Sequence, residues 1–209
     1  MSQTGNKALR FLMIDHYDSF TYNLLALIRL QGIEIDLIKE DEYHPINGSE
    51  KTYHALIFSP GPGGPDRTGS SLQYFDEWVG KLPIFGVCLG MQIMAHKLQQ
   101  RSAHSSDAHA AGPYVVHQAA SIQHGKTDRL RIRPGSQIFA GIPDGITVVR
   151  YHSLAIGAPE EQISSRAFSD GEVMSLEIPE LKLYGVQFHP ESLLSECGAK
   201  MINNFAALL

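Results

Sequence analysis

Short apolar runs alternate with segments of helical spacing through the first half of this chain. The runs, which are typical of buried strands, cover residues 9–14, 33–38, 55–58 and 83–87. Between them, a helix can begin at Asp18 or Ser19 and end at Gly32, and helical spacing returns over residues 70–80 and 91–98. Strands that alternate with helices predict a parallel sheet with helices on both faces.

The second half of the chain has a different pattern, made mostly of short β-like segments. The candidate strands cover residues 114–117, 130–132, 147–150, 163–168 and 173–177. They could form an antiparallel edge of the main sheet or a small second sheet. Residues 183–188 have the pattern of a final core strand, and residues 199–208 that of a closing helix. We therefore expect an α/β fold with an open, mostly parallel sheet and a small antiparallel edge sheet.

Length and composition limit the classes of protein that suit this fold. The 209 residues suit one compact domain, residues 1–209, better than two small ones. A net charge of −5 argues against a nucleic-acid groove, which needs a basic surface. Cys88 and Cys197 make no disulfide framework, which favours a reducing compartment. Because there is neither a signal-peptide pattern nor a run of ~18 apolar residues, we expect a cytoplasmic protein without a membrane partner.

A cysteine framed by glycines follows the fourth apolar run. Cys88 lies between Gly86 and Gly90, after a predicted strand and before a predicted helix. This is the setting of a nucleophile elbow, in which glycines permit the tight turn. The amides and partial positive charge at the start of the helix favour a reactive thiolate. The alternative is a buried structural cysteine beside two packing glycines.

A histidine and a glutamate end the last predicted core strand. His189 and Glu191 are two residues apart, so their side chains leave an extended chain on the same face. A carboxylate beside an imidazole orients it and stabilises its charged form, so that the imidazole can accept and return a proton. The alternative is a solvated or packed pair. Parallel strands would bring this pair and Cys88 to the same sheet edge.

Residues 59–65, Ser-Pro-Gly-Pro-Gly-Gly-Pro, follow the third predicted strand. Such a turn has few large side chains, so its backbone amides can approach a ligand closely. It could supply one N–H group of an oxyanion hole, and Leu89, which follows the nucleophile, could supply the other. The alternative is a simple turn between a strand and a helix.

Six stretches of the chain carry a resemblance to a known family. Residues 15–24, 59–65, 86–92 and 185–192 resemble, in order, the motifs of class I glutamine amidotransferases, whose fold is flavodoxin-like. Two more, residues 124–127 and 150–154, narrow the resemblance to the small subunits of anthranilate synthase and aminodeoxychorismate synthase. Together these stretches span almost the whole chain.

The resemblance implies a reaction and a role for each matched residue. Cys88 would attack the side-chain amide of L-glutamine to give a thioester and ammonia, with His189 as base and then acid, oriented by Glu191. Amides of Gly63 and Leu89 would form the oxyanion hole. The predicted glutamine-binding residues are Gly61, Pro62, Gly63, Gln92, Ser153 and Leu154.

The resemblance also implies a protein partner and no cofactor. Ammonia would pass to a chorismate-binding large subunit. The predicted contact with that subunit is a loop made of His124, Gly125, Lys126 and Thr127, for which the alternative is a solvated turn. Of the two products, we favour anthranilate over aminodeoxychorismate.

The chain departs from the family pattern at two places. The nucleophile turn usually reads Gly-His-Gln, whereas this chain has Met91 in the middle position. We expect Met91 beside the site, where the change would be tolerated but could alter the contact with the partner. The chain is also longer over residues 101–114, which we expect to form an exposed loop.

The histidines in or beside this insertion, His104, His109 and His117, have no spacing typical of a metal site, so we predict none. Cys197 lies far from any candidate base in the sequence and is interpreted as a bystander.

Two other functions fit parts of the pattern. A stand-alone Cys-His-Glu peptidase or γ-glutamyl hydrolase could use the same three residues, but the stretches at 124–127 and 150–154 speak against it. A non-catalytic regulatory or binding module could keep the fold, but the presence of Cys88, Gln92, His189 and Glu191 disfavours it.

Overall fold

The protein is described by a computed structural model that covers residues 8–44, 53–104 and 114–209. Its strands form one sheet in the order β2-β1-β3-β4-β9-β8-β7-β5-β6. The first five of these strands are parallel. Their bounds are β1 Arg10–Asp15, β2 Glu34–Lys39, β3 Ala55–Phe58, β4 Ile84–Val87 and β9 Leu183–Val186. The predicted parallel sheet is therefore confirmed.

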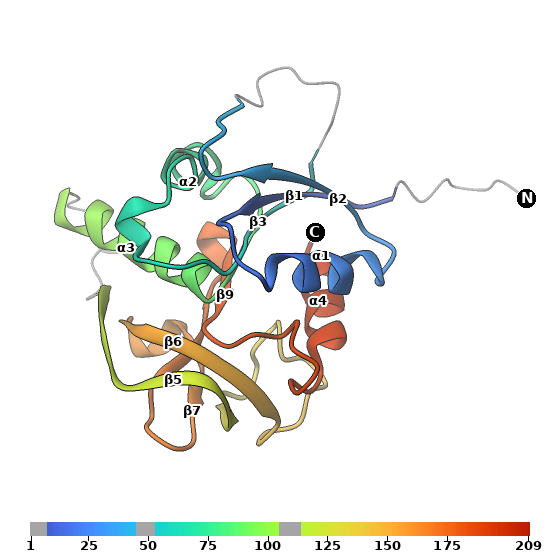
Figure 1. Ribbon diagram of the computed structural model, residues 1–209. Helices are drawn as coiled ribbons and strands as arrows, with labels where there is room; N and C mark the ends of the chain where they lie inside the picture. Colours follow the sequence, from blue (N-terminus) through green and yellow to red (C-terminus); the bar gives the residue numbers. More distant parts are fainter. Residues whose placement is uncertain (1–7, 45–52, 105–113) are drawn as a thin grey trace, which may run out of the picture.

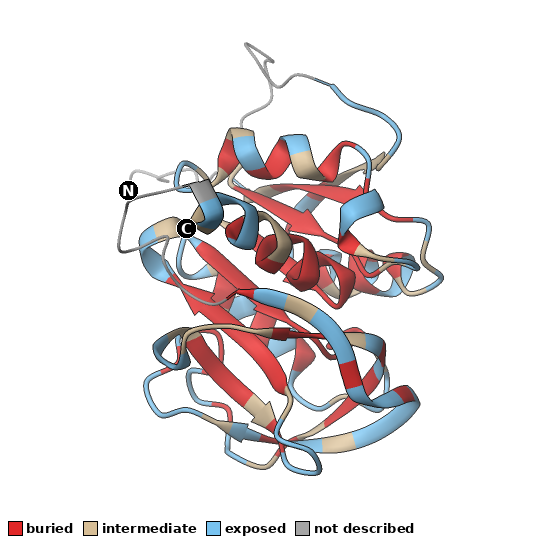
Figure 2. Ribbon diagram, turned by 90° about the vertical axis from the view of Figure 1, so that its left-hand side faces the viewer, coloured by how far each residue is buried: buried red, intermediate tan, exposed pale blue. Residues whose placement is uncertain are grey.

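Helices cover both faces of the parallel half (Figure 1). On one face lie α1 (Thr21–Arg29) and α4 (Gly198–Ala206), and on the other lie α2 (Ser71–Trp78) and α3 (Leu89–His104). Strand β1 contributes apolar side chains to both faces of the sheet, because successive side chains point to opposite sides of a strand. Its Phe11 and Met13 pack with α1 and α4, whereas Leu12 and Ile14 pack with α2 and α3. Two apolar layers thus bury the parallel strands (Figure 2).

Two of the expected helices differ markedly from their expected bounds, whereas α2 and α4 differ by only one or two residues at each end. Helix α1 begins at Thr21 rather than at Asp18 or Ser19, and Asp18 instead accepts a hydrogen bond from the amide of Phe20. Helix α3 is longer than residues 91–98 and continues to His104, so the first part of the expected loop at 101–114 is helical. Residues 105–113 of that loop lie outside the described residues.

The antiparallel half adds β8 (Val173–Ile178), β7 (Ile163–Ala167), β5 (Val115–Ile132) and β6 (Thr147–Gly157) to the sheet. The prediction of two short strands at 114–117 and 130–132 is wrong, because β5 is one continuous strand of 18 residues. Its last residues pair with β7, and residues 115–118, 123–124 and 126–129 pair with β6, with a shift of register at each gap. Most of β5 is exposed (Figure 2), which explains why its middle lacks an apolar pattern.

The carboxyl ends of four neighbouring parallel strands meet at one edge of the sheet. Strand β1 leads to His16, β3 to the turn at 59–65, β4 to Cys88, and β9 to the segment 187–191. Open α/β sheets bind their ligands at this edge. Within the described ranges, no helix is both long and apolar enough to span a membrane.

Candidate active site

Cys88 occupies a strained turn between β4 and α3. Its φ angle is 52°, a left-handed conformation that residues other than glycine rarely adopt. The neighbouring glycines make the turn possible. A Cβ atom at Gly86 would lie 2.5 Å from the backbone of Gly90, and one at Gly90 would lie 2.3 Å from the carbonyl oxygen of Phe58. The geometry is that of a nucleophile elbow at the start of a helix.

His189 and Glu191 form a buried pair beside this turn. Glu191 Oε1 lies 2.6 Å from His189 Nδ1, and both side chains are almost fully buried. The other ring nitrogen, Nε2, has no hydrogen-bond partner among the described residues. Burial opposes a positive charge on the ring, but interactions with Cys88 and Glu191 outweigh it and raise the pKa of His189 well above its usual value. The pair is arranged to hold a proton taken from the thiol.

A cavity of about 140 Å³ opens beside Cys88. It is lined by Gly61, Pro62, Gly63, Cys88, Gln92, His124, Tyr151, His152, Ser153 and Leu154. All six residues predicted to bind glutamine are among them. Tyr151 and His152 were not predicted as site residues, although they belong to the stretch at 150–154 that carried the resemblance.

The turn at 59–65 is held against the start of α3. Gly61 fits closely there, because a Cβ atom at this position would lie 2.4 Å from His16 Cβ and 2.6 Å from Leu89 Cδ2. Gly63 has a φ angle of 84°, which favours glycine. The amide of Leu89 lies in the first turn of α3, where amides lack helical acceptors. Gly63 lines the cavity and Leu89 follows Cys88 directly, and an oxyanion hole made by their amides stays a prediction.

His16 supports the same turn, a role that the sequence pattern did not reveal. Its ring lies 3.0 Å from the carbonyl oxygen of Ser59 and 2.7 Å from Ser71 Oγ. The ring is almost completely buried, and burial lowers the pKa of His16 to about 4. His16 is therefore a neutral imidazole that ties the turn to the start of α2.

Gln92 contributes its amide to the wall of the cavity. Its Nε2 donates to the carbonyl oxygen of Leu154 and to Gln187 Oε1, each over 3.2 Å. Both hydrogens of the amide nitrogen are thus used, so the accepting oxygen Oε1 is the polar atom of Gln92 left for a ligand.

Gln187 is a further buried residue that the sequence analysis missed. Its Nε2 lies 3.6 Å from Cys88 Sγ. The available signal was its position inside the motif stretch at 185–192, two residues before His189. In the structure Gln187 lies in a bend directly after β9.

The predicted partner contact, residues 124–127, is not a loop. It lies inside β5, where Gly125 has a φ angle of 68° and the pairing with β6 shifts register. All four of its residues are exposed. The ring of His124 stacks on Tyr151 with 5.1 Å between the centroids, and both residues line the cavity. The segment therefore forms part of the rim of the cavity.

The side chains of Met91 and Cys197, which were singled out in the sequence, do not line the cavity beside Cys88. Met91 is on the first turn of α3, as expected, but its fully buried side chain packs against Gly185 and cannot contact a partner. Cys197 is exposed at the start of α4. No group of metal-binding side chains occurs in the described parts of the chain, and His109 lies outside them.

Comparison with known proteins gives a consistent result. The family model of class-I glutamine amidotransferases matches residues 12–208. The aminodeoxychorismate/anthranilate synthase component 2 of Bacillus subtilis is 38% identical over 198 residues, which cover 93% of this chain and 94% of that protein. The anthranilate synthase component 2 of Lactococcus lactis is 36% identical, with coverage of 93% and 92%. The chain spans 32% of a bifunctional protein of Thermotoga maritima that is also 36% identical.

Among solved structures, a protein of Thermoplasma acidophilum assigned to GMP synthase has the same fold. Its TM-score is 0.77 at 22% identity, and the match covers 96% of this chain and 94% of that one. The match to the family model over nearly the full length places the chain among its members. The chain belongs to the class-I glutamine amidotransferases.

Proposed function

We propose that the chain is the glutaminase subunit of a synthase that aminates chorismate, and that residues 1–209 act as one amidotransferase domain in the cytoplasm. The observation that carries this proposal is the buried pair of His189 and Glu191 beside Cys88, which itself lines a cavity together with Gln92. This set contains a nucleophile, a base with its orienting carboxylate, and a polar wall for a small amide substrate.

The reaction follows from these positions. Cys88 gives its proton to His189, and the sulfur attacks the side-chain amide carbon of L-glutamine. Amides of Gly63 and Leu89 stabilise the oxyanion that forms. His189 then returns the proton to the leaving nitrogen, which departs as ammonia and leaves a thioester. Water, activated by the same imidazole, hydrolyses the thioester to glutamate and restores the thiol.

The partner proposed for this subunit is a chorismate-binding large subunit. His124 and Tyr151 are exposed at the rim of the cavity, and residues 125–127 are exposed beside His124 on β5, so a partner bound there would receive ammonia without its release to water. Related proteins named for anthranilate and for aminodeoxychorismate match this chain at 36–38% identity, and the Bacillus subtilis relative carries both names. We favour anthranilate as the product. The second candidate is aminodeoxychorismate, made by a separate synthase or by one that shares this subunit.

Product analysis tests the proposal. The chain is mixed with L-glutamine, chorismate and the chorismate-using subunit encoded in the same genome, and the products are separated by chromatography. We expect anthranilate, and glutaminase activity that rises when the large subunit is added. Aminodeoxychorismate as the only product would show that the chain serves aminodeoxychorismate synthase and not anthranilate synthase. Equal glutaminase rates with and without the partner would instead support a stand-alone hydrolase.

A further inference from the structure

Strand β6 contacts three parts of the site through its main chain. Three of its carbonyl oxygens face three residues of the site. The pairs are Val149 O with His189 N at 2.9 Å, Tyr151 O with Cys88 Sγ at 3.7 Å, and Leu154 O with Gln92 Nε2 at 3.2 Å. The position of β6 therefore determines how the base, the nucleophile and the cavity wall lie relative to one another.

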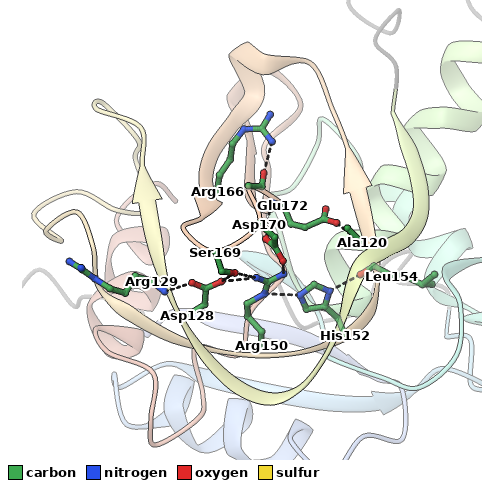
Figure 3. Close-up of polar contacts among 11 residues, drawn as sticks. Ala120, Asp128, Arg129, Arg150, His152, Leu154, Arg166, Ser169, Asp170 and Glu172 are labelled. Carbon is green, nitrogen blue, oxygen red and sulfur yellow. Dashed lines mark hydrogen bonds and ion pairs between the residues drawn. The ribbon is translucent and has the colours of Figure 1, made fainter.

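Arg150 lies on this strand and is fully buried, although its side chain is charged. Its Nη1 lies 2.7 Å from Asp128 Oδ2, and its Nη2 lies 2.9 Å from Asp170 Oδ2 (Figure 3). Asp128 belongs to β5, whereas Asp170 belongs to the turn between β7 and β8. Ser169 in the same turn accepts a further hydrogen bond from Nη1. The guanidinium thus ties β6 to two other segments of the antiparallel half.

The third nitrogen of the Arg150 guanidinium, Nε, faces a residue of the cavity lining. This Nε donates to His152 Nε2 over 3.1 Å, so the hydrogen of the neutral ring is on Nδ1. That Nδ1 in turn donates to the carbonyl oxygen of Leu154 over 2.9 Å (Figure 3). Burial, together with the charge of Arg150, lowers the pKa of His152 to about 4 and keeps the ring neutral. Gln92 donates to the same carbonyl oxygen, so an unbroken chain of contacts joins Arg150 to the wall of the cavity.

A buried ion pair is weak evidence that the pair stabilises the fold, because proteins with apolar residues of similar volume in its place are often equally stable. Its geometric effect is stronger, since guanidinium is planar and its donors have fixed directions. We propose that Arg150 is a positioning residue for the glutaminase reaction: through Asp128, Asp170 and His152 it fixes β6, and with it the relative placement of Cys88, His189 and Gln92. This role rests on the proposed function.

The test compares two identical substitutions. Arg150→Lys keeps the charge but loses the fork of donors, and Arg166→Lys makes the same change on β7, which β5 separates from β6 in the sheet. Arg166 pairs with the exposed Glu160 and with the carbonyl oxygen of Gly171, both outside the site. We expect Arg150→Lys to lower kcat/KM for glutamine by about tenfold or more, because small displacements of reacting groups slow a reaction strongly. Arg166→Lys should leave kcat/KM unchanged, and thermal unfolding shows that each variant is folded at the assay temperature.

A double-mutant cycle separates positioning from general loss of structure. If Arg150 acts through His152, the losses in kcat/KM caused by Arg150→Lys and His152→Ala should be less than additive when the two are combined. Should Arg150→Lys fail to fold, Asp170→Asn takes its place in the cycle, because it removes one charge at an exposed turn with little change of shape. Additive losses, or equal activity of the Arg150 and Arg166 variants, would overturn the positioning role.

The wild-type chain, assayed in parallel, distinguishes this inference from the proposed function. If it hydrolyses glutamine while the Arg150 variants keep full activity, only the positioning role is wrong. If it shows no glutaminase activity even with the partner subunit, the proposed function is wrong and the positioning role with it.

Discussion

The side-chain amide of Gln187 lies 3.6 Å from the sulfur of Cys88, although the two residues are 99 positions apart in the chain. Gln187 is fully buried, and its oxygen accepts a hydrogen bond from the amide of Gln92. One side chain therefore links the candidate nucleophile to the wall of the glutamine cavity. A donor aimed at sulfur can stabilise the negative charge that the sulfur carries while it attacks the substrate.

The first prediction concerns this donor. Gln187→Leu keeps the approximate volume of the side chain but removes its amide, and we expect kcat for glutamine hydrolysis to fall. A hydrogen bond to a charged group contributes about 1.5–3 kcal/mol, which corresponds to roughly a tenfold loss or more. Steady-state kinetics measure the effect. The matched control is Gln31→Leu, at a partly exposed position after α1, which should keep wild-type activity. Wild-type kcat in Gln187→Leu would exclude a contribution of this amide.

The second prediction concerns the nucleophile. Cys88→Ser should abolish glutaminase activity and leave the fold intact, because a hydroxyl is far less ionised than a thiol at neutral pH. Cys197→Ser, at the exposed cysteine, is the control and should remain active. A diazo-ketone analogue of glutamine should label Cys88 and spare Cys197, as determined by mass spectrometry of peptides. Turnover by Cys88→Ser at the wild-type rate would refute the assignment.

The third prediction concerns the carboxylate that pairs with the base. Glu191→Gln keeps the shape of the side chain but removes its charge, so the pKa of His189 should fall from its raised value. The imidazolium formed during attack is then less stable, and we expect kcat to drop by about two orders of magnitude or more. The rate at which iodoacetamide labels Cys88 at pH 6–7 should fall as well. Glu196→Gln, on the exposed segment before α4, is a control that should preserve both rates.

The fourth prediction concerns the dependence of stability on pH. The pKa values of His16 and His152 are lowered to about 4 in the folded state, from an ordinary value of 6.5. The unfolded chain therefore binds more protons than the folded one between these values. The stabilisation is fully present above pH 6.5 and is lost as the pH falls toward 4. The loss amounts to roughly 3 kcal/mol for each histidine at most.

Urea denaturation between pH 4 and pH 8 measures this effect as the free energy of unfolding. His16→Asn should flatten the curve in the acidic range, whereas His124→Asn, at an exposed histidine on β5, should leave its shape unchanged. An identical acidic slope in the wild type and in His16→Asn would show that His16 is not held neutral by burial.

Local sequence patterns were sufficient to predict the parallel half of the fold and the candidate triad. Buried strands such as β3 and β4 are short apolar runs, and their pattern does not depend on distant residues. The elbow at Cys88 could be predicted because Gly86 and Gly90 are within two positions of it. His189 and Glu191 are close neighbours in the sequence, so their spacing alone suggests the pair, although the structure places them after the end of β9, where Glu191 lies in a turn.

Tertiary structure decided the features that depend on partners far away in the chain. Strand β5 is continuous because β6 and β7 pair with its polar residues, and a local pattern does not contain that pairing. Arginine side chains are usually exposed, but that of Arg150 is buried. Its burial is possible because the carboxylates of Asp128 and Asp170, from two other segments, pair with it. The same holds for Gln187 at the sulfur of Cys88. Local spacing determines which residues can carry the chemistry, whereas long-range hydrogen bonds and ion pairs determine which others hold them in place.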